Sequence, residues 1–215
     1  MRLGKASTFD LDYTLIKANC SFEFCRYLVR CRILPKSALF LAVFVYLKHR
    51  FFGLSLEEMH KVIFQKILMG LHLPTLEKHV EIFIKKHLVN RLYAPAVAYL
   101  RRAQHLGHYT AILSSSPSFL VKPIAKFFQV DEWRASVYEV DQQKRFSGIS
   151  FVLQGRDKAK YVQELAKRAI RQENVIAFSD SHLDIPFLLS AGCAVIVNPD
   201  RKLRRFSQKH NWSMI

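Results

Sequence analysis

From about residue 91 to its end, the chain alternates between helical and strand-like patterns of apolar residues. A helical segment that ends at Gly107 precedes the apolar run YTAIL (109–113). The patterns that follow are helix, strand, strand, helix and strand, then helix, strand and helix, within 117–128, 133–140, 146–153, 158–170, 174–179 and 183–208. Strands that alternate with helices are typical of a parallel sheet covered on both faces. The sequence therefore predicts an α/β fold.

The stretch from residue 19 to residue 90 differs, because its apolar residues recur every three or four positions and no strand pattern interrupts them. The apolar residues before it, which run out at Phe9, belong to the predicted sheet. The helical stretch therefore interrupts the sheet after its first strand. We expect a core made of residues 1–18 and 91–215, with an all-helical insertion at 19–90.

Length, cysteine usage and the first residues indicate where the protein works. Half of the 215 residues are hydrophobic, so the chain can bury the core of one domain without disulfides. Its four cysteines form no CxxC pair, and Met1–Phe9 is too short and too polar for a signal peptide. We therefore expect a cytoplasmic protein.

The charge is strongly unbalanced. Lysine and arginine number 33 against 17 aspartates and glutamates, which gives a net charge of +16. Such an excess favours a polyanionic partner, which could be nucleic acid, an anionic membrane face or a phosphorylated substrate. Charge alone does not choose among these partners.

Acidic and hydroxyl side chains gather where the predicted strands end. The residues in these positions are Asp10, Asp12, Thr14, Ser114, Ser115, Asp180 and Asp184, and Lys158 begins the helix before the last of these strands. In open parallel sheets the ligand site lies beyond the carboxyl ends of the strands. We therefore expect these side chains to converge from distant parts of the chain.

The carboxylates among them suit a magnesium ion. Mg²⁺ binds through one or two carboxylates and keeps water molecules that a phosphate can replace. We expect Asp10 and Asp180 to be its direct ligands, within a metal site that comprises Asp10, Asp12, Asp180 and Asp184.

The same residues can carry out phosphoryl transfer. An aspartate beside Mg²⁺ and a lysine can attack phosphorus and form an aspartyl-phosphate, which is the role expected for Asp10. Asp12, two residues along the same loop, is placed to act as general acid and then as general base. Lys158 and Ser114 would neutralise the phosphate oxygens.

Four motifs carry a family resemblance. FDLDYT, ILSSSP, GRDKAK and FSDSHLDIP resemble, in this order, the motifs of the haloacid dehalogenase (HAD) superfamily, and the stretch 19–90 resembles its C1 cap. The resemblance implies a Rossmann-like core, phosphatase activity and Mg²⁺ as cofactor. The implied roles are nucleophile for Asp10, acid/base for Asp12, phosphate binding for Thr14, Ser114 and Ser115, phosphoryl stabilisation for Lys158, and metal binding for Asp180 and Asp184.

Some positions depart from the family pattern or leave a choice. Lys160 is an alternative to Lys158, but two residues apart on a helix point to different faces, and the register favours Lys158. Tyr13 stands where glycine is common, and Leu183 stands where relatives resembling phosphoserine phosphatase carry asparagine. These two departures concern the substrate more than the reaction.

LSSSP, SDSxxDxP and an apolar cap together resemble subfamily IB, with its phosphatidylglycerophosphatase C and phosphoserine phosphatase-like enzymes. The resemblance implies a lipid phosphate such as phosphatidylglycerophosphate as favoured substrate. Asn19 stands where phosphoserine phosphatases carry the glutamate that holds the substrate ammonium, which disfavours free phosphoserine.

A soluble-metabolite phosphatase of the phosphoserine or histidinol-phosphate type remains an alternative. A further alternative is a basic nucleic-acid-binding protein without activity, although the only dense basic run is 201–205 and no nucleic-acid motif occurs.

The run Ala38–Leu47 is apolar and has basic residues on both sides. It is too short to span a bilayer, which takes about 20 residues. It could lie at the face of an anionic membrane, with its cationic flanks near the lipid headgroups. It could instead be the buried central helix of the cap, because helices apolar on every side are usually core.

Overall fold

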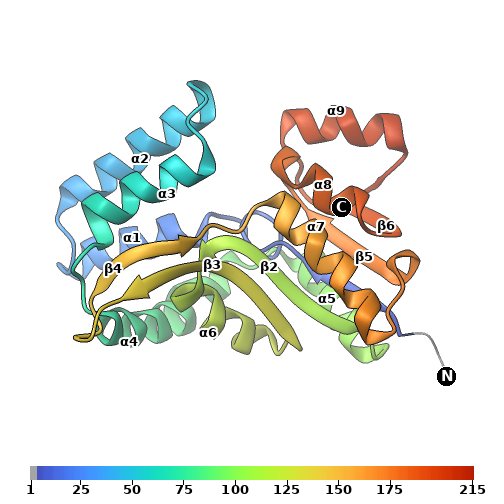
Figure 1. Ribbon diagram of the computed structural model, residues 1–215, viewed down its shortest axis with the longest axis horizontal. Helices are drawn as coiled ribbons and strands as arrows, with labels where there is room; N and C mark the ends of the chain where they lie inside the picture. The colour runs from blue at the N-terminus through green and yellow to red at the C-terminus, as the bar shows by residue number, and fades with distance from the viewer. Residues whose placement is uncertain (1–3) are drawn as a thin grey trace.

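In the computed structural model, residues 4–215 are described, and they build a seven-stranded sheet (Figure 1). The strands are β1 (Ala6–Phe9), β2 (Tyr109–Pro117), β3 (Glu132–Val140), β4 (Phe146–Phe151), β5 (Val175–Ser179), β6 (Cys193–Ile196) and β7 (Ser213–Met214). Their order across the sheet is β4-β3-β2-β1-β5-β6-β7. The predicted α/β fold is confirmed, and residues 1–3 of the predicted core lie outside the described residues.

One strand pair departs from the parallel arrangement. β3 and β4 are antiparallel, whereas each of the other neighbouring pairs is parallel. A short turn joins β3 to β4, and a turn of this kind can only connect antiparallel strands, because a parallel connection needs a crossover.

Helices precede or follow most of the strands. The α-helices are α1 (Cys20–Arg30), α2 (Lys36–Phe51), α3 (Leu56–Ile63), α4 (Leu73–Phe83), α5 (Ala94–His105), α6 (Ser118–Phe128), α7 (Gly155–Glu164), α8 (Ile185–Leu189) and α9 (Arg201–His210). Two π-helical turns, η1 (Phe64–Leu68) and η2 (Ile84–Leu88), continue α3 and α4. Short 3₁₀ turns are η3 (Val89–Arg91), η4 (Leu165–Arg168), η5 (Gln172–Asn174) and η6 (His182–Asp184).

Each face of the sheet has its own apolar core, because successive strand residues point to opposite faces. In β2, Ile112 belongs to the core that includes α5 and α6, whereas Ala111 and Leu113 belong to the core that includes α7, α8 and α9. The central strand β1 is buried along its whole length. Asp10, which follows this strand, is therefore held at a fixed position.

The segment between β1 and β2 is helical from α1 to η3, and we call it the helical insertion. The two connections that join it to the sheet run side by side, since Lys17 N–H donates to the Arg91 carbonyl at 2.7 Å and Tyr93 N–H donates to the Leu15 carbonyl at 2.9 Å. The division predicted at residues 18/19 and 90/91 lies close to these connections. α1 and α4 pack on the core through residues such as Phe24.

The helices α2 and α3 form an antiparallel pair that projects from the rest of the chain, away from the sheet (Figure 1). Within α2 only Ala38 and Val45 are buried. Phe40 and Phe51 in the helix and Phe52 just after it are 75%, 72% and 82% exposed. Of the two interpretations of the run Ala38–Leu47, the buried central helix is therefore wrong. The helix is apolar all round, but its neighbours α1 and α3 cover only one narrow side of it.

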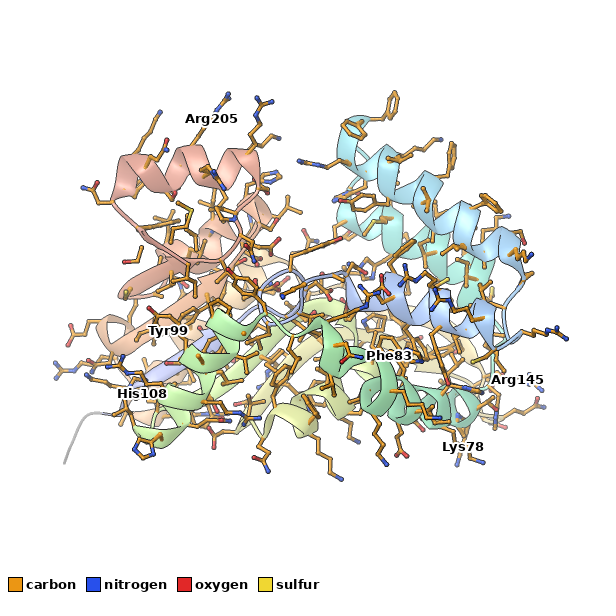
Figure 2. All side chains as sticks on the ribbon, turned by 180° about the vertical axis from the view of Figure 1, so that it is seen from behind. Lys78, Phe83, Tyr99, His108, Arg145 and Arg205 are labelled. Atoms are coloured by element: carbon orange, nitrogen blue, oxygen red, sulfur yellow. The ribbon has the colours of Figure 1, made fainter. Side chains whose placement is uncertain are left out.

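The positive charge is spread over the surface. Figure 2 shows Arg205 of α9 at one side of the molecule, and Lys78 of α4 and Arg145 before β4 near one another at the opposite side. In the run 201–205, Leu203 is buried against the sheet and the four basic residues are exposed on α9.

Within residues 4–215, none of the helices combines the length and the apolar character that crossing a bilayer requires.

The α2–α3 pair contacts the core at a buried histidine. His60 of α3 is 7% exposed, and its Nδ1 lies 2.8 Å from the hydroxyl oxygen of Tyr138 in β3. Burial, and to a lesser degree the neighbouring His49, lower the pKa of His60 to about 4 from its ordinary value of 6.5. The folded protein therefore excludes a proton that the unfolded chain takes up below about pH 6.5.

We expect His60 to destabilise the protein in acid. As pH falls from about 6.5 to about 4, its contribution should lower the free energy of unfolding by up to roughly 3 kcal/mol. Glutamine in His60→Gln does not titrate in this range. The free energy of unfolding of wild type minus that of the variant, both from urea unfolding, should therefore fall by that amount between pH 6.5 and pH 4. Carboxylates that titrate in the same range affect both proteins alike, so their contribution cancels in this difference and only that of His60 remains. The same exchange at His105, which is exposed on α5, is the control, and an equal pH dependence in all three proteins would contradict the expectation.

Candidate active site

Three neighbouring strands bring the predicted residues to one edge of the sheet. Asp10 follows β1, Ser114 lies in β2 and Asp180 follows β5, and β2, β1 and β5 are adjacent and parallel. The Asp10 N–H donates to the carbonyl of Phe178 at 2.9 Å, which continues the pairing of β1 with β5 just beyond the last residue of β1. The convergence expected at the carboxyl ends of the strands is therefore present.

A lysine from α7 reaches into this edge. The Lys158 Nζ lies 2.5 Å from Asp10 Oδ1 and 2.7 Å from Asp184 Oδ2, and the lysine side chain is only 3% exposed. The Ser179 hydroxyl donates to the same Asp184 oxygen at 2.7 Å. Lys160, the alternative of the sequence analysis, is 72% exposed and pairs with Asp157 instead.

Burial and like charges set the protonation of this group. Burial raises the pKa of Asp10 to about 7, with Lys158 opposing the rise and Asp184 and Asp12 adding to it. Burial also raises the pKa of Asp180 well above its ordinary value, and the nearby Asp10 and Asp184 raise it further. For Lys158 burial alone would lower the pKa, but Asp10 and Asp184 raise it above its usual range. One cation thus faces several crowded carboxylates.

Asp12 makes a different set of contacts. Its Oδ1 accepts from the Cys20 N–H at 2.7 Å, at the start of α1, and its Oδ2 accepts from the Ser116 hydroxyl at 2.8 Å. The Ser21 hydroxyl lies 2.8 Å from the same Ser116 oxygen. The carboxylate of Asp12 therefore joins the first loop to the helical insertion and to the end of β2.

The sequence does not identify the Ser116 hydroxyl or the Cys20 backbone as partners of Asp12. The run Ser114–Ser116 gave a signal for a polar position, but not for which hydroxyl faces Asp12. Nothing in the pattern indicated a contact from a backbone N–H at residue 20.

The predicted phosphate-binding residues are not equally accessible. Ser115 lines the cleft, whereas Ser114 and Thr14 are buried beneath it. The Ser114 Oγ accepts from the Ser116 N–H at 3.1 Å. The Thr14 hydroxyl lies 3.5 Å from Asp180 Oδ1, so Thr14 is positioned against a carboxylate. The roles assigned to these three residues remain predictions.

The site opens into a cleft of about 590 Å³, within the range of small-ligand sites. Asp10, Asp12, Lys158, Asp180 and Asp184 line its floor, and its walls come from several separate parts of the chain. α2 contributes Tyr46, His49 and Arg50, and the loops around α8 and α9 contribute residues that include His182, Leu183 and Asp200. The helical insertion therefore forms one wall of the cleft, and the basic Arg50 faces an acidic floor.

The donor set fits a hard divalent cation with few protein ligands. Residues 4–215 contain no group of three or more histidine, cysteine, aspartate or glutamate side chains arranged to hold a metal ion. Mg²⁺ commonly takes only one or two carboxylates and keeps water elsewhere. The buried carboxylates of Asp10 and Asp180 both have raised pKa values, and Asp10 contributes to the rise at Asp180. They are donors that such an ion would stabilise.

A glycine allows α7 to approach this site. A Cβ atom placed on Gly155 would lie 2.2 Å from the backbone oxygen of Leu183. The first turn of α7 thus packs directly on the loop that carries Asp184. This close approach places Lys158, one turn later, against Asp184.

Comparisons with known proteins agree with this fold. The family model described as haloacid dehalogenase-like hydrolase matches residues 8–189, and the chain therefore belongs to this family. It is an enzyme with phosphatases among its relatives. The Mycobacterium tuberculosis protein named probable phosphatase Rv3661 is 25% identical over 224 residues, which cover 100% of this chain and 76% of that protein.

Solved structures share the fold. A Bordetella pertussis protein described as having unknown function has a TM-score of 0.86 at 22% identity, and the match covers 99% of this chain and 98% of that one. A structure described as a phospho-aspartyl intermediate analogue of phosphoserine phosphatase has a TM-score of 0.72 at 18% identity, covering 99% and 93%.

We expect Gly155→Ala to destabilise the protein by about 1–3 kcal/mol, because the new methyl group must push α7 away from backbone atoms that cannot rotate aside. Urea unfolding measures the change. Gly148→Ala in β4 is the matched control, because its Cβ would meet only the Glu139 side chain, whose carboxylate can rotate aside. Equal stability of the two variants would show that α7 has room to move.

Proposed function

We propose that this protein is a Mg²⁺-dependent phosphomonoesterase that works through an aspartyl-phosphate intermediate. The observation that supports this most is the contact of Lys158 with both Asp10 and Asp184 beside Asp180, at the carboxyl ends of three adjacent strands. A nucleophile, a fixed cation and further carboxylates are the groups that phosphoryl transfer needs in one place.

Asp10 would attack the phosphorus atom and displace the substrate alcohol. Its Oδ1 is bonded to Lys158, which leaves Oδ2 to form the new bond to phosphorus. The Lys158 ammonium would stay close to the phosphoryl oxygens and stabilise their charge. Asp10 and Asp180 would hold Mg²⁺, with Asp184 and Asp12 completing the acidic set. Mg²⁺ would supply positive charge to the phosphoryl oxygens.

Asp12 would donate a proton to the leaving alcohol and then accept one from the water molecule that hydrolyses the aspartyl-phosphate. Its two contacts, with the Cys20 N–H and the Ser116 hydroxyl, hold the carboxylate in one orientation. Ser114, Ser115 and Thr14 would bind or support the phosphate through hydroxyl and backbone groups.

The helical insertion would act as a cap that selects the substrate, and the favoured substrate is a lipid phosphate such as phosphatidylglycerophosphate. Support comes from the subfamily IB resemblance and from the exposed apolar surface of α2. Asn19 lines the cleft, but its side-chain oxygen accepts from the Phe22 N–H at 2.8 Å and caps α1. It carries no charge to pair with the ammonium of phosphoserine.

A soluble-metabolite phosphatase is an equally supported alternative. Phosphoserine phosphatase structures share the fold, and the cleft is lined by polar side chains that would suit a small phosphoester. The lipid-phosphate and the soluble-metabolite hypotheses involve the same reaction at Asp10.

With Mg²⁺ present, we expect phosphate release from detergent-dispersed phosphatidylglycerophosphate to exceed release from phosphoserine and from a panel of soluble phosphoesters. Asp10→Asn, which removes the nucleophile, should lower the rate at least about a thousandfold. Release from soluble esters alone would support the alternative substrate. Equal release by wild type and Asp10→Asn would overturn the mechanism.

We further propose that α2 contacts an anionic membrane. Phe40 and Phe44 are exposed on α2, Phe51 and Phe52 are exposed at its end, and Lys36 and Lys48 lie on the same helix. Exposed aromatic rings beside cations are the composition with which helices bind at the headgroup level.

Binding to vesicles tests this contact. The double variant Phe40→Ser/Phe44→Ser should bind vesicles of anionic lipid about tenfold more weakly or worse, because two rings no longer leave water. Flotation with the vesicles measures the bound fraction. Leu106→Ser/Leu189→Ser removes two other exposed apolar side chains and is the control. Equal weakening by both pairs, or no binding by wild type, would contradict the contact.

A further inference from the structure

A second cavity lies between the helical insertion and the core. Its volume is about 450 Å³, which falls in the range of small-ligand sites. Its walls come from α1, α2, α3 and the turn after it, and the end of β2 with the start of α6. The apolar wall residues include Phe24, Leu28, Ala42, Met59, Ile63 and Phe119.

This apolar cavity adjoins the catalytic cleft. Four residues, Tyr13, Asn19, Tyr46 and Ser115, line both the cleft and the cavity. They come from the loop after β1, the start of α1, the middle of α2 and the end of β2. These four residues form a neck, and a ligand could lie in both spaces through it.

Several polar side chains in the cavity wall already have partners. The Ser116 hydroxyl donates to Asp12, the Ser21 hydroxyl contacts Ser116, and His60 pairs with Tyr138. Within residues 4–215, every buried side-chain nitrogen or oxygen has a hydrogen-bond partner. The wall therefore offers few hydrogen-bonding groups to a polar ligand, and its apolar side chains favour the burial of a hydrocarbon chain.

Tyr13 is held at the neck by an unusual backbone conformation. Its φ is 59°, in the left-handed region that favours glycine, because a Cβ atom there lies close to the following carbonyl oxygen. Residues strained in this way tend to cluster at ligand sites. Here the strained position brings an aromatic ring to the passage between the two spaces.

We propose that the apolar cavity binds the hydrophobic chain of the substrate while the phosphate lies against Asp10 and Lys158. This inference rests on the proposed phosphatase reaction. Among lipid phosphates it favours those whose alkyl chain begins close to the phosphate over phosphatidylglycerophosphate, in which two glycerol units and a phosphodiester separate the terminal phosphate from the acyl chains. The chain would pass between Tyr13 and Tyr46 and lie along α1 and α3. Ala42, Leu28 and Ile63 would limit how long a chain fits.

Binding should therefore depend on chain length. Each methylene that enters the cavity adds about 0.8 kcal/mol, which is roughly fourfold in affinity, until the cavity is full. A substrate recognised only in the polar cleft would show no such series. The heat capacity change on binding should also become more negative with each added methylene.

Calorimetry with n-alkyl phosphonates from ethyl to decyl, below the concentrations at which they form micelles and with Mg²⁺ present, tests the inference without turnover. We expect the Kd to fall roughly fourfold per methylene and then to level off. A Kd that does not change with chain length would overturn the assignment.

A cavity-filling variant locates the binding. Ala42→Trp should reduce the ratio of ethyl to decyl phosphonate Kd at least about tenfold. Ala98→Trp is the matched control, because it makes the same exchange at an exposed residue of α5 that lines neither space. An unchanged ratio in Ala42→Trp, or an equal loss in both variants, would place the chain elsewhere and overturn the assignment.

Binding of the phosphonates and phosphate release from the matching alkyl phosphates together separate this inference from the proposed function. Chain-length-dependent binding without phosphate release from any alkyl phosphate would overturn the proposed reaction and leave the cavity assignment standing. Phosphate release with equal kcat/KM for ethyl and decyl phosphate would leave the reaction standing and overturn the cavity assignment.

Discussion

The ammonium group of Lys158 lies between two buried carboxylates, and the arrangement of the site depends on this charge. Buried charges are stable only when they are paired and hydrogen-bonded. Lys158 Nζ bonds to Asp10 after β1 and to Asp184 after β5, so α7 is tied to two strands that are distant in sequence. The close packing at Gly155 brings the helix near enough for both contacts.

The sheet could be predicted from the sequence because its signals are local. A run such as YTAIL followed by a helical pattern identifies a buried strand, and acidic residues at the strand ends follow from the geometry of a parallel sheet. The sequence predicts Asp10 and Asp180 in this way. Helical geometry places Lys158 and Lys160 on different faces of one helix, and the register of the family motif favours Lys158. The chemistry of the residues suggests roles for Asp10, Asp12, Ser114 and Lys158, and the family resemblance implies the same roles and adds those of Thr14 and Ser115.

Other features depend on packing between distant segments, which a single sequence does not show. The α2 run is apolar on every side, and periodicity cannot tell whether neighbouring elements will cover it. The contact of Ser116 with Asp12 depends on how β2 bends at its end, where its pairing with β3 shifts register between Ser114 and Pro117. β7 has only two residues and pairs with β6 after a helix, so it leaves almost no pattern.

The contact between Cys20 and Asp12 uses a backbone N–H and not a side chain. Any amino acid except proline supplies that donor, so the identity of residue 20 is nearly free as far as this contact is concerned. The first turn of the insertion can therefore stay attached to the acidic loop while the rest of the insertion changes in sequence. The helices of the insertion form the walls of the apolar cavity, and one of them, α2, also presents an exposed outer surface. Substitutions in these helices can therefore change which ligands related proteins bind without altering the charged residues beneath them.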